Sequence, residues 1–119
     1  MGKGVALEAV ERFPGLRRTL GEKVLQQGNI PVLCPAERII SFPTKHHWKD
    51  PSDLSLIRAS TETLKLCWPI VRDFSTMAGV QPLPICLPKV GCGNGGLDWN
   101  TQVLPLLSGL LDENYIVVL

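Results

Sequence analysis

The sequence predicts an α/β fold in which helices pack on a partly parallel sheet. Three observations support this prediction. Amphipathic helical patterns alternate with short β-branched runs, a glycine-rich loop stands between a strand and a helix, and residues 115–119 form an apolar run typical of a buried strand. Strands that alternate with helices in this way build layered folds, because a helix carries the chain from one parallel strand to the next.

The composition fits one globular domain. The chain has 119 residues, of which 45% are hydrophobic, and a formal net charge of +1. We expect a single domain over residues 1–119, because a chain of this length forms one core. The near-zero charge argues against sequence-blind nucleic-acid binding through bulk positive charge, although it leaves room for a local basic site.

The sequence shows no sign of a membrane segment or a metal site. No apolar run approaches the roughly 20 residues that a membrane helix needs. Charged residues interrupt any signal-peptide core near the start, so we expect a cytoplasmic protein with no membrane partner. The cysteines lack a C-x-x-C pair and metal-ligand spacing, so we expect reduced thiols and no metal. We also expect no cofactor. They are Cys34, Cys67, Cys86 and Cys92.

Two helices and two strands are predicted in the first third of the chain. Residues 5–13 carry an apolar face at helical spacing, and Pro14-Gly15 ends that helix. Residues 16–27 form a second helical stretch, before Gly28-Asn29. Residues 30–34 form a weak edge strand because Pro31 interrupts them. Residues 38–42 form a better strand, which Pro43 ends.

A long helix is predicted to run to about Met77 and to end at Gly79. It follows Ser52, which can cap it, and Asp53, which favours the positive helix end. Pro69 lies inside the pattern and should kink or split the helix near Trp68. One stripe of the helix is apolar or small, and it contains Ile57, Ser60, Leu64, Cys67, Val71 and Phe74.

The last third predicts a strand, a helix and a terminal strand. Residues 83–90 form the first strand, in which prolines confine regular pairing to residues 85–87. Asp98 is a good cap for a helix from Trp99 to about Leu111. Asn114 then turns the chain into the terminal strand.

The residues from Gly91 to Gly96 form the strongest candidate ligand loop. Four glycines in six positions stand between a strand and a helix. Such a loop lets the backbone approach a ligand closely and can cradle a phosphate or diphosphate with its amides. A Lys-Ser/Thr pair does not follow, so the loop is not a nucleotide-hydrolysing P-loop. The alternative is a long strand-to-helix turn.

Two further segments have functional alternatives. Met1-Gly2-Lys3-Gly4 opens a helix and could form a second amide cradle, or be a disordered terminus. Residues 41–48 place Lys45, two histidines and two aromatic residues after a strand. Lys45 could serve as a nucleophile or base and a histidine could transfer protons, or the segment could be a solvated loop. Cys92 could be a nucleophile, but a small residue in a phosphate loop is the preferred interpretation.

Together these segments resemble the macro domain family. The likeness extends over almost the whole chain. Within the family, the chain is similar to one branch, the DNA ADP-ribosyl glycohydrolase antitoxin type, which is related to the terminal ADP-ribose glycohydrolases of animals. The matching motifs are Met1-Gly2-Lys3-Gly4, Phe42-Pro43-Thr44-Lys45-x-His47-Trp48 and Gly91-Cys92-Gly93-Asn94-Gly95-Gly96-Leu97-Asp98-Trp99.

The resemblance implies a macro-domain-like mixed sheet sandwiched between helices, with ADP-ribose in a surface cleft. It implies that Lys45 is catalytic and acts at the anomeric carbon of the distal ribose, where a neutral amine can attack C1″ or the opened aldehyde. The animal relatives carry an acid in the glycine loop, which is absent here, so Asp98 is a helix cap. Trp48 and Trp99 are interpreted as packing residues. The implied ligand-binding residues are Gly2, Lys3, Gly4, Thr44, Gly91, Cys92, Gly93, Asn94, Gly95 and Gly96.

The resemblance also implies an N-terminally truncated domain. Family members normally have two more strands before the first ligand loop, with residues that recognise adenine and the distal ribose. A sheet with a gap leaves backbone groups unpaired, so self-association that completes the sheet is one expectation. An upstream start codon is another.

The function implied is hydrolysis of ADP-ribosyl linkages, with ADP-ribosylated DNA as substrate and a cognate ADP-ribosyltransferase toxin as partner. Two alternatives stay open. One is a non-catalytic module that binds ADP-ribose or a related nucleotide, and the other is a phosphatase acting on ADP-ribose 1″-phosphate. A remnant that binds nothing without a partner is a third, structural interpretation.

Overall fold

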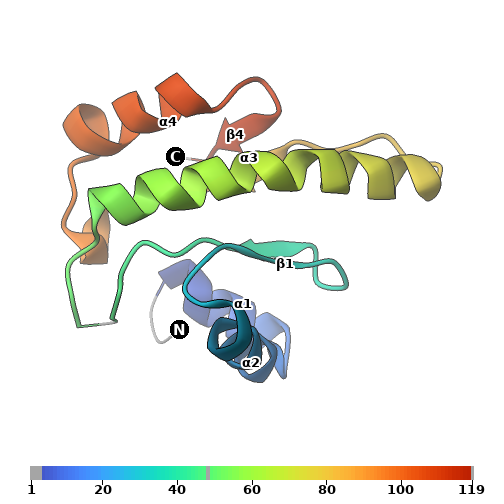
Figure 1. The fold of residues 1–119 in the computed structure, drawn as a ribbon, viewed down its shortest axis with the longest axis horizontal. Helices are drawn as coiled ribbons and strands as arrows, with labels where there is room; N and C mark the ends of the chain where they lie inside the picture. The colour runs from blue at the N-terminus through green and yellow to red at the C-terminus, as the bar shows by residue number, and fades with distance from the viewer. Residues whose placement is uncertain (1–3, 48, 119) are drawn as a thin grey trace. The chain divides into compact units, whose positions relative to one another are not determined.

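The computed structural model describes residues 4–47 and 49–118, which form two compact units divided between Ser41 and Phe42 (Figure 1). The expectation of a single domain over residues 1–119 stays a prediction. Among the described residues, no helix is long and apolar enough to cross a membrane. The same residues contain no cluster of three His, Cys, Asp or Glu side chains placed to hold a metal ion.

The first unit contains two helices and an antiparallel strand pair. Helix α1 spans Gly4–Arg12 and helix α2 spans Leu16–Gln27. Strands β1 (Val32–Cys34) and β2 (Ile39–Ser41) pair with Leu33 opposite Ile40. All four elements confirm the sequence prediction, with shorter strands. Their small core consists of Leu16, Leu20, Val32 and Cys34, with Ala9, Phe13 and Ile39 packed against it.

The second unit contains a long helix and a parallel strand pair. Helix α3 spans Leu54–Met77, and strands β3 (Ile85–Leu87) and β4 (Tyr115–Val117) are parallel. This pair confirms the predicted parallel component. Prolines 84 and 88 flank β3 and limit it to the predicted three residues. The core consists of Ile57, Leu87, Val90, Val103 and Leu107, from α3, from β3 and the residues after it, and from the helices between β3 and β4.

Three short helical segments lie between β3 and β4. The 3₁₀ turn η1 spans Gly93–Gly95, the π-helical turn η2 spans Trp99–Val103, and helix α4 spans Leu104–Leu110. Asp98 caps η2 as predicted, because its Oδ2 accepts a 2.8 Å hydrogen bond from the Thr101 amide. The predicted helix therefore exists, but it begins with a π-helical turn just before Pro105, which has no N–H to donate.

The long helix corrects two predictions. Helix α3 is continuous through Pro69, so of the two predicted outcomes, a kink or a split near Trp68, the split is wrong. A proline inside a helix costs about 3 kcal/mol, and the buried face that ends at Cys67 offsets this cost. The predicted stripe is buried only as far as Cys67, and Phe74 is exposed.

The cap of α3 is also different from the prediction. Asp53, and not Ser52, is the cap, since Asp53 Oδ1 accepts the Ser55 amide at 2.9 Å. Ser52 is buried, and its hydroxyl has no hydrogen-bond partner among the described residues.

Candidate functional site

The N-terminus of α3 joins two of the segments that the sequence singles out. The Asp53 amide donates to the Thr44 carbonyl at 2.9 Å, and the Ser52 amide donates to the Gly95 carbonyl at 2.9 Å. The Ser60 hydroxyl, two turns into α3, donates to the Pro43 carbonyl at 2.8 Å. The lysine-containing segment and the glycine loop are therefore hydrogen-bonded to consecutive residues of one helix start.

Lys45 lies against the glycine loop. Its Nζ donates to the Asn94 carbonyl at 3.4 Å, across 49 positions of sequence. The side chain is half-exposed, so the amine is accessible to a ligand. The structure thus brings together Thr44, Lys45 and the loop from Gly91 to Gly96, which are ligand-site residues expected from the resemblance.

The glycine loop folds back on itself through its own amides. The Gly96 amide donates to the Gly93 carbonyl at 3.1 Å, and the Leu97 amide donates to the Gly91 carbonyl at 3.1 Å. Gly91, Gly93 and Gly96 have φ values of 76°, 69° and 79°, which favour glycine. The exposed residues Gly93 and Asn94 begin η1, and the first amides of a helical turn have no partner within it. These two amides are the best placed in the loop to meet an anion.

Two of the glycines are also required by packing. A Cβ at Gly95 would collide with the Ser52 hydroxyl and lie 3.0 Å from Ser52 Cβ. A Cβ at Gly91 would lie 2.5 Å from Ile57 Cδ1 on α3. The resemblance implied that every glycine of the loop binds the ligand, but Gly95 also lets the loop pack on Ser52, and Gly91 lets it pack on Ile57 of α3.

Asp53 and His46 also belong to this site, although neither is among the ligand-binding residues that the resemblance implies. His46 Nε2 lies 2.7 Å from Asp53 Oδ2. The hydrogen bond with His46, followed by the one from the Ser55 amide, lowers the pKa of Asp53. The only sequence signal for Asp53 was its helix-start position, which does not reveal a contact with the preceding loop.

Cys92 lies in the loop as a half-buried thiol. Burial, followed by the charge of Asp98, raises the pKa of Cys92 above its ordinary value. A raised pKa keeps the thiol protonated, so the nucleophile alternative loses support. The interpretation of Cys92 as a small packing residue agrees with its contact with the core of the second unit.

The remaining predicted residues lie outside the described ranges, in the first unit, or against the core of the second unit. Gly2, Lys3 and the packing residue Trp48 lie outside the described residues. Gly4 is the first residue of α1 and belongs to the first unit. Trp99 packs against the core of the second unit, which confirms its interpretation as a packing residue.

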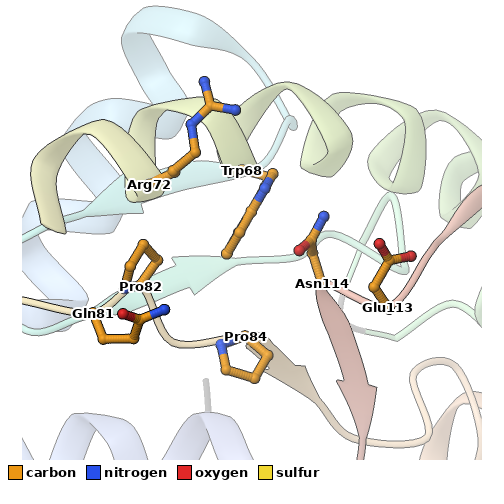
Figure 2. A pocket seen from close by; sticks show the side chains of 7 residues that line it. All are labelled: Trp68, Arg72, Gln81, Pro82, Pro84, Glu113 and Asn114. Carbon is orange, nitrogen blue, oxygen red and sulfur yellow. The ribbon is translucent and has the colours of Figure 1, made fainter. Parts of the chain in front are cut away.

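A cavity of about 260 Å³ lies elsewhere in the second unit (Figure 2). Trp68 extends from α3 into this cavity, which is also lined by Pro84 and Asn114, the residues that immediately precede β3 and β4. Because these strands are parallel, the cavity lies at the edge where both begin, whereas the glycine loop follows the end of β3. None of the predicted site residues lines this cavity.

Comparison with known proteins gives a consistent result, although no family model matches the chain. A Mycobacterium tuberculosis protein described as a DNA ADP-ribosyl glycohydrolase is 34% identical over 118 residues, which cover 91% of this chain and 31% of that protein. A Thermosipho africanus fusion of a DNA ADP-ribosyl transferase and a DNA ADP-ribosyl glycohydrolase is 38% identical over 77 residues, which cover 65% of this chain and 17% of the fusion. The chain thus spans about a third or less of the curated relatives it matches.

The similarity extends to three-dimensional structure. The solved macrodomain of Mycobacterium tuberculosis DarG superposes with a TM-score of 0.67 and 28% identity, covering 98% of this chain and 79% of that one. The macrodomain of Thermus aquaticus DarG gives a TM-score of 0.63 and 29% identity. Matching fold and matching sequence over most of its length show that this chain belongs to the macrodomain family, in the branch of the DNA ADP-ribosyl glycohydrolases.

Proposed function

We propose that the protein removes ADP-ribose from ADP-ribosylated DNA and that Lys45 is its catalytic residue. The contact between Lys45 Nζ and the Asn94 carbonyl is the observation that carries this proposal, since it places an amine beside the loop that suits a diphosphate. The substrate is taken from the relatives, whose descriptions name DNA ADP-ribosyl glycohydrolase activity.

The proposed reaction separates binding from bond cleavage. The amides at the start of η1 hold the diphosphate, which fixes the distal ribose beside Lys45. The Lys45 nitrogen attacks C1″ with its lone pair, the bond from C1″ to the DNA base breaks, and the base leaves with the proton that the nitrogen gives up. Water then hydrolyses the lysine adduct, which releases ADP-ribose and restores the amine.

The partner follows from the same comparison. The Thermosipho africanus protein joins a DNA ADP-ribosyl transferase to a DNA ADP-ribosyl glycohydrolase in one chain. We therefore propose that a transferase of this kind supplies the substrate, as an ADP-ribosyltransferase toxin whose modification this protein reverses.

A single-stranded oligonucleotide carrying ADP-ribose tests the proposal. The wild-type protein should restore the unmodified oligonucleotide and release ADP-ribose. Lys45→Ala should be slower by about 100-fold or more, which is the lower end of what a positioned acid, base or nucleophile contributes. Mobility of the oligonucleotide on a denaturing gel measures both rates.

Lys49→Ala is the matched control, because it removes a lysine from the same segment and should leave the rate within about twofold. Unchanged substrate with the wild-type protein, or equal rates for wild type and Lys45→Ala, would contradict the proposal. Binding of ADP-ribose without cleavage, measured by titration calorimetry, would instead assign the non-catalytic binding module.

A further inference from the structure

Asp53 contacts both chain neighbours of Lys45. Its backbone amide donates to the Thr44 carbonyl at 2.9 Å, which fixes the chain on one side of the lysine. Its carboxylate Oδ2 lies 2.7 Å from His46 Nε2, which fixes the side chain on the other side. Asp53 therefore contacts the residue before Lys45 and the residue after it, which restricts the movement of the chain at Lys45.

Asp53 is itself fixed to a rigid element. Its other carboxylate oxygen, Oδ1, caps α3 by accepting the Ser55 amide at 2.9 Å. The first turns of that helix are anchored by Ile57 and Thr61, both fully buried. A carboxylate that uses one oxygen on the helix and the other on His46 transmits the position of the helix to the loop.

The glycine loop is hydrogen-bonded to the same helix start. The lysine-containing segment and the glycine loop therefore contact each other and also contact adjacent residues before α3. Ser52 holds the Gly95 carbonyl through its amide at 2.9 Å. Asn94, the residue before Gly95, accepts the hydrogen bond from Lys45 Nζ at 3.4 Å. The distance between the lysine amine and the glycine loop is therefore set by two adjacent residues, Ser52 and Asp53.

We propose that Asp53 is a positioning residue that sets where the Lys45 amine stands relative to the glycine loop, acting through the His46 imidazole and the Thr44 carbonyl. The inference rests on the proposed function, in which Lys45 is the catalytic residue. Displacing a reactive group by about 1 Å can cost on the order of 100-fold in rate. The bond to the Thr44 carbonyl comes from the Asp53 backbone and is kept when only the side chain becomes Asn. Losing the His46 contact alone should therefore lower the rate by less than 100-fold.

The variants separate the contact with His46 from the cap. Asp53→Asn keeps a good N-cap and the backbone amide, but removes the charged acceptor for His46. His46→Ala breaks the same contact from the other side without touching α3, and His46→Gln restores a side-chain donor. Asp112→Asn is the matched control, because Asp112 Oδ1 also accepts an amide two residues on, that of Asn114, at 2.9 Å.

We expect kcat on ADP-ribosylated DNA to fall about tenfold in Asp53→Asn and in His46→Ala, with KM within about twofold. The double variant should be no slower than either single variant, because both remove one contact. His46→Gln should recover part of the rate, and Asp112→Asn should match the wild type. Unchanged kcat in both single variants, losses that multiply in the double variant, or an equal loss in Asp112→Asn would overturn the inference.

A second readout does not depend on activity. The ¹⁵N order parameter of the Lys45 amide should fall in His46→Ala and Asp53→Asn, and it should stay at the wild-type value in Asp112→Asn. An inactive wild-type protein whose Lys45 order parameter follows this pattern would refute the proposed function and leave the positioning role intact. An order parameter that none of the variants changes would refute the positioning role, whatever the activity.

Discussion

The two ends of α3 have opposite surroundings. At the N-terminal end Ile57 is 0% exposed, and hydrogen bonds from residues 52, 53 and 60 reach both loops of the site. At the C-terminal end Phe74 and Met77 are 59% and 87% exposed. Both ends belong to one continuous α-helix, so the secondary structure alone does not distinguish the end at the site from the other end. The N-terminal end differs because it combines buried side chains with hydrogen bonds to segments that are distant in sequence. That combination lets the preceding loop hold the Lys45 amine in place.

The largest expected effect separates the buried and exposed faces in the middle of α3, where the same substitution is made at two leucines. Leu64→Ala removes a side chain that is 2% exposed and should lower the free energy of unfolding by about 2–5 kcal/mol. Leu66→Ala removes one that is 71% exposed and should change it by less than about 0.5 kcal/mol. Urea denaturation measures both values. A comparable loss in Leu66→Ala would mean that this face is covered in solution, which would break the comparison.

A smaller effect is expected where the glycine loop lies on Ser52. Gly95→Ala should destabilise the protein by about 1–3 kcal/mol, because the new methyl group has no space beside the Ser52 side chain. Adding Ser52→Gly should recover most of this loss, since it vacates the space. Gly109→Ala in α4, where nothing lies within 4 Å of the new Cβ, is the control and should be neutral or stabilising. Equal stabilities of Gly95→Ala and the wild type in urea would show that the loop does not pack on Ser52.

The smallest effect concerns Tyr115, which contacts the middle of α3. Its hydroxyl donates to the Leu64 carbonyl at 3.3 Å, and burial, followed by Asp112 and Cys67, raises the pKa of Tyr115 to about 12. A raised pKa means that the folded state favours the neutral phenol. The stabilisation is therefore complete below the unfolded pKa of about 10 and is lost as pH rises toward the folded value.

Tyr115→Phe checks this sign. At neutral pH the variant should be less stable by about 1 kcal/mol, the usual net value of one hydrogen bond. Between about pH 10 and 12 the wild type should lose stability relative to the variant, so the difference in urea midpoints should shrink. A difference that stays constant over this range would show that the phenol is not buried on α3.

Local signals in the sequence predicted much of the fold. Pro14-Gly15 and Gly28 correctly bounded α2, and the prolines beside Ile85–Leu87 correctly bounded β3. Pro69 does not split α3, because tertiary burial of one helix face outweighs a local breaker. Propensity alone could not have revealed this outcome.

Long-range contacts in the site were beyond local patterns. Only the family resemblance brought Lys45 and the glycine loop into one predicted site, because 49 positions of sequence separate Lys45 from Asn94. The contact between His46 and Asp53 spans a turn with no periodicity to reveal it. The roles of Gly95 and Ser52 depend on how closely the loop approaches α3, which appears only once the two are placed together.

Titration of ¹⁵N-labelled protein with ADP-ribose tests most directly whether the two loops on α3 form one ligand site. The amide resonances of residues 44–46 and 93–96 should shift together and saturate with a single dissociation constant, because both segments contact one ligand. Shifts confined to one of these segments, or shifts centred on the cavity beside Trp68, would contradict the account.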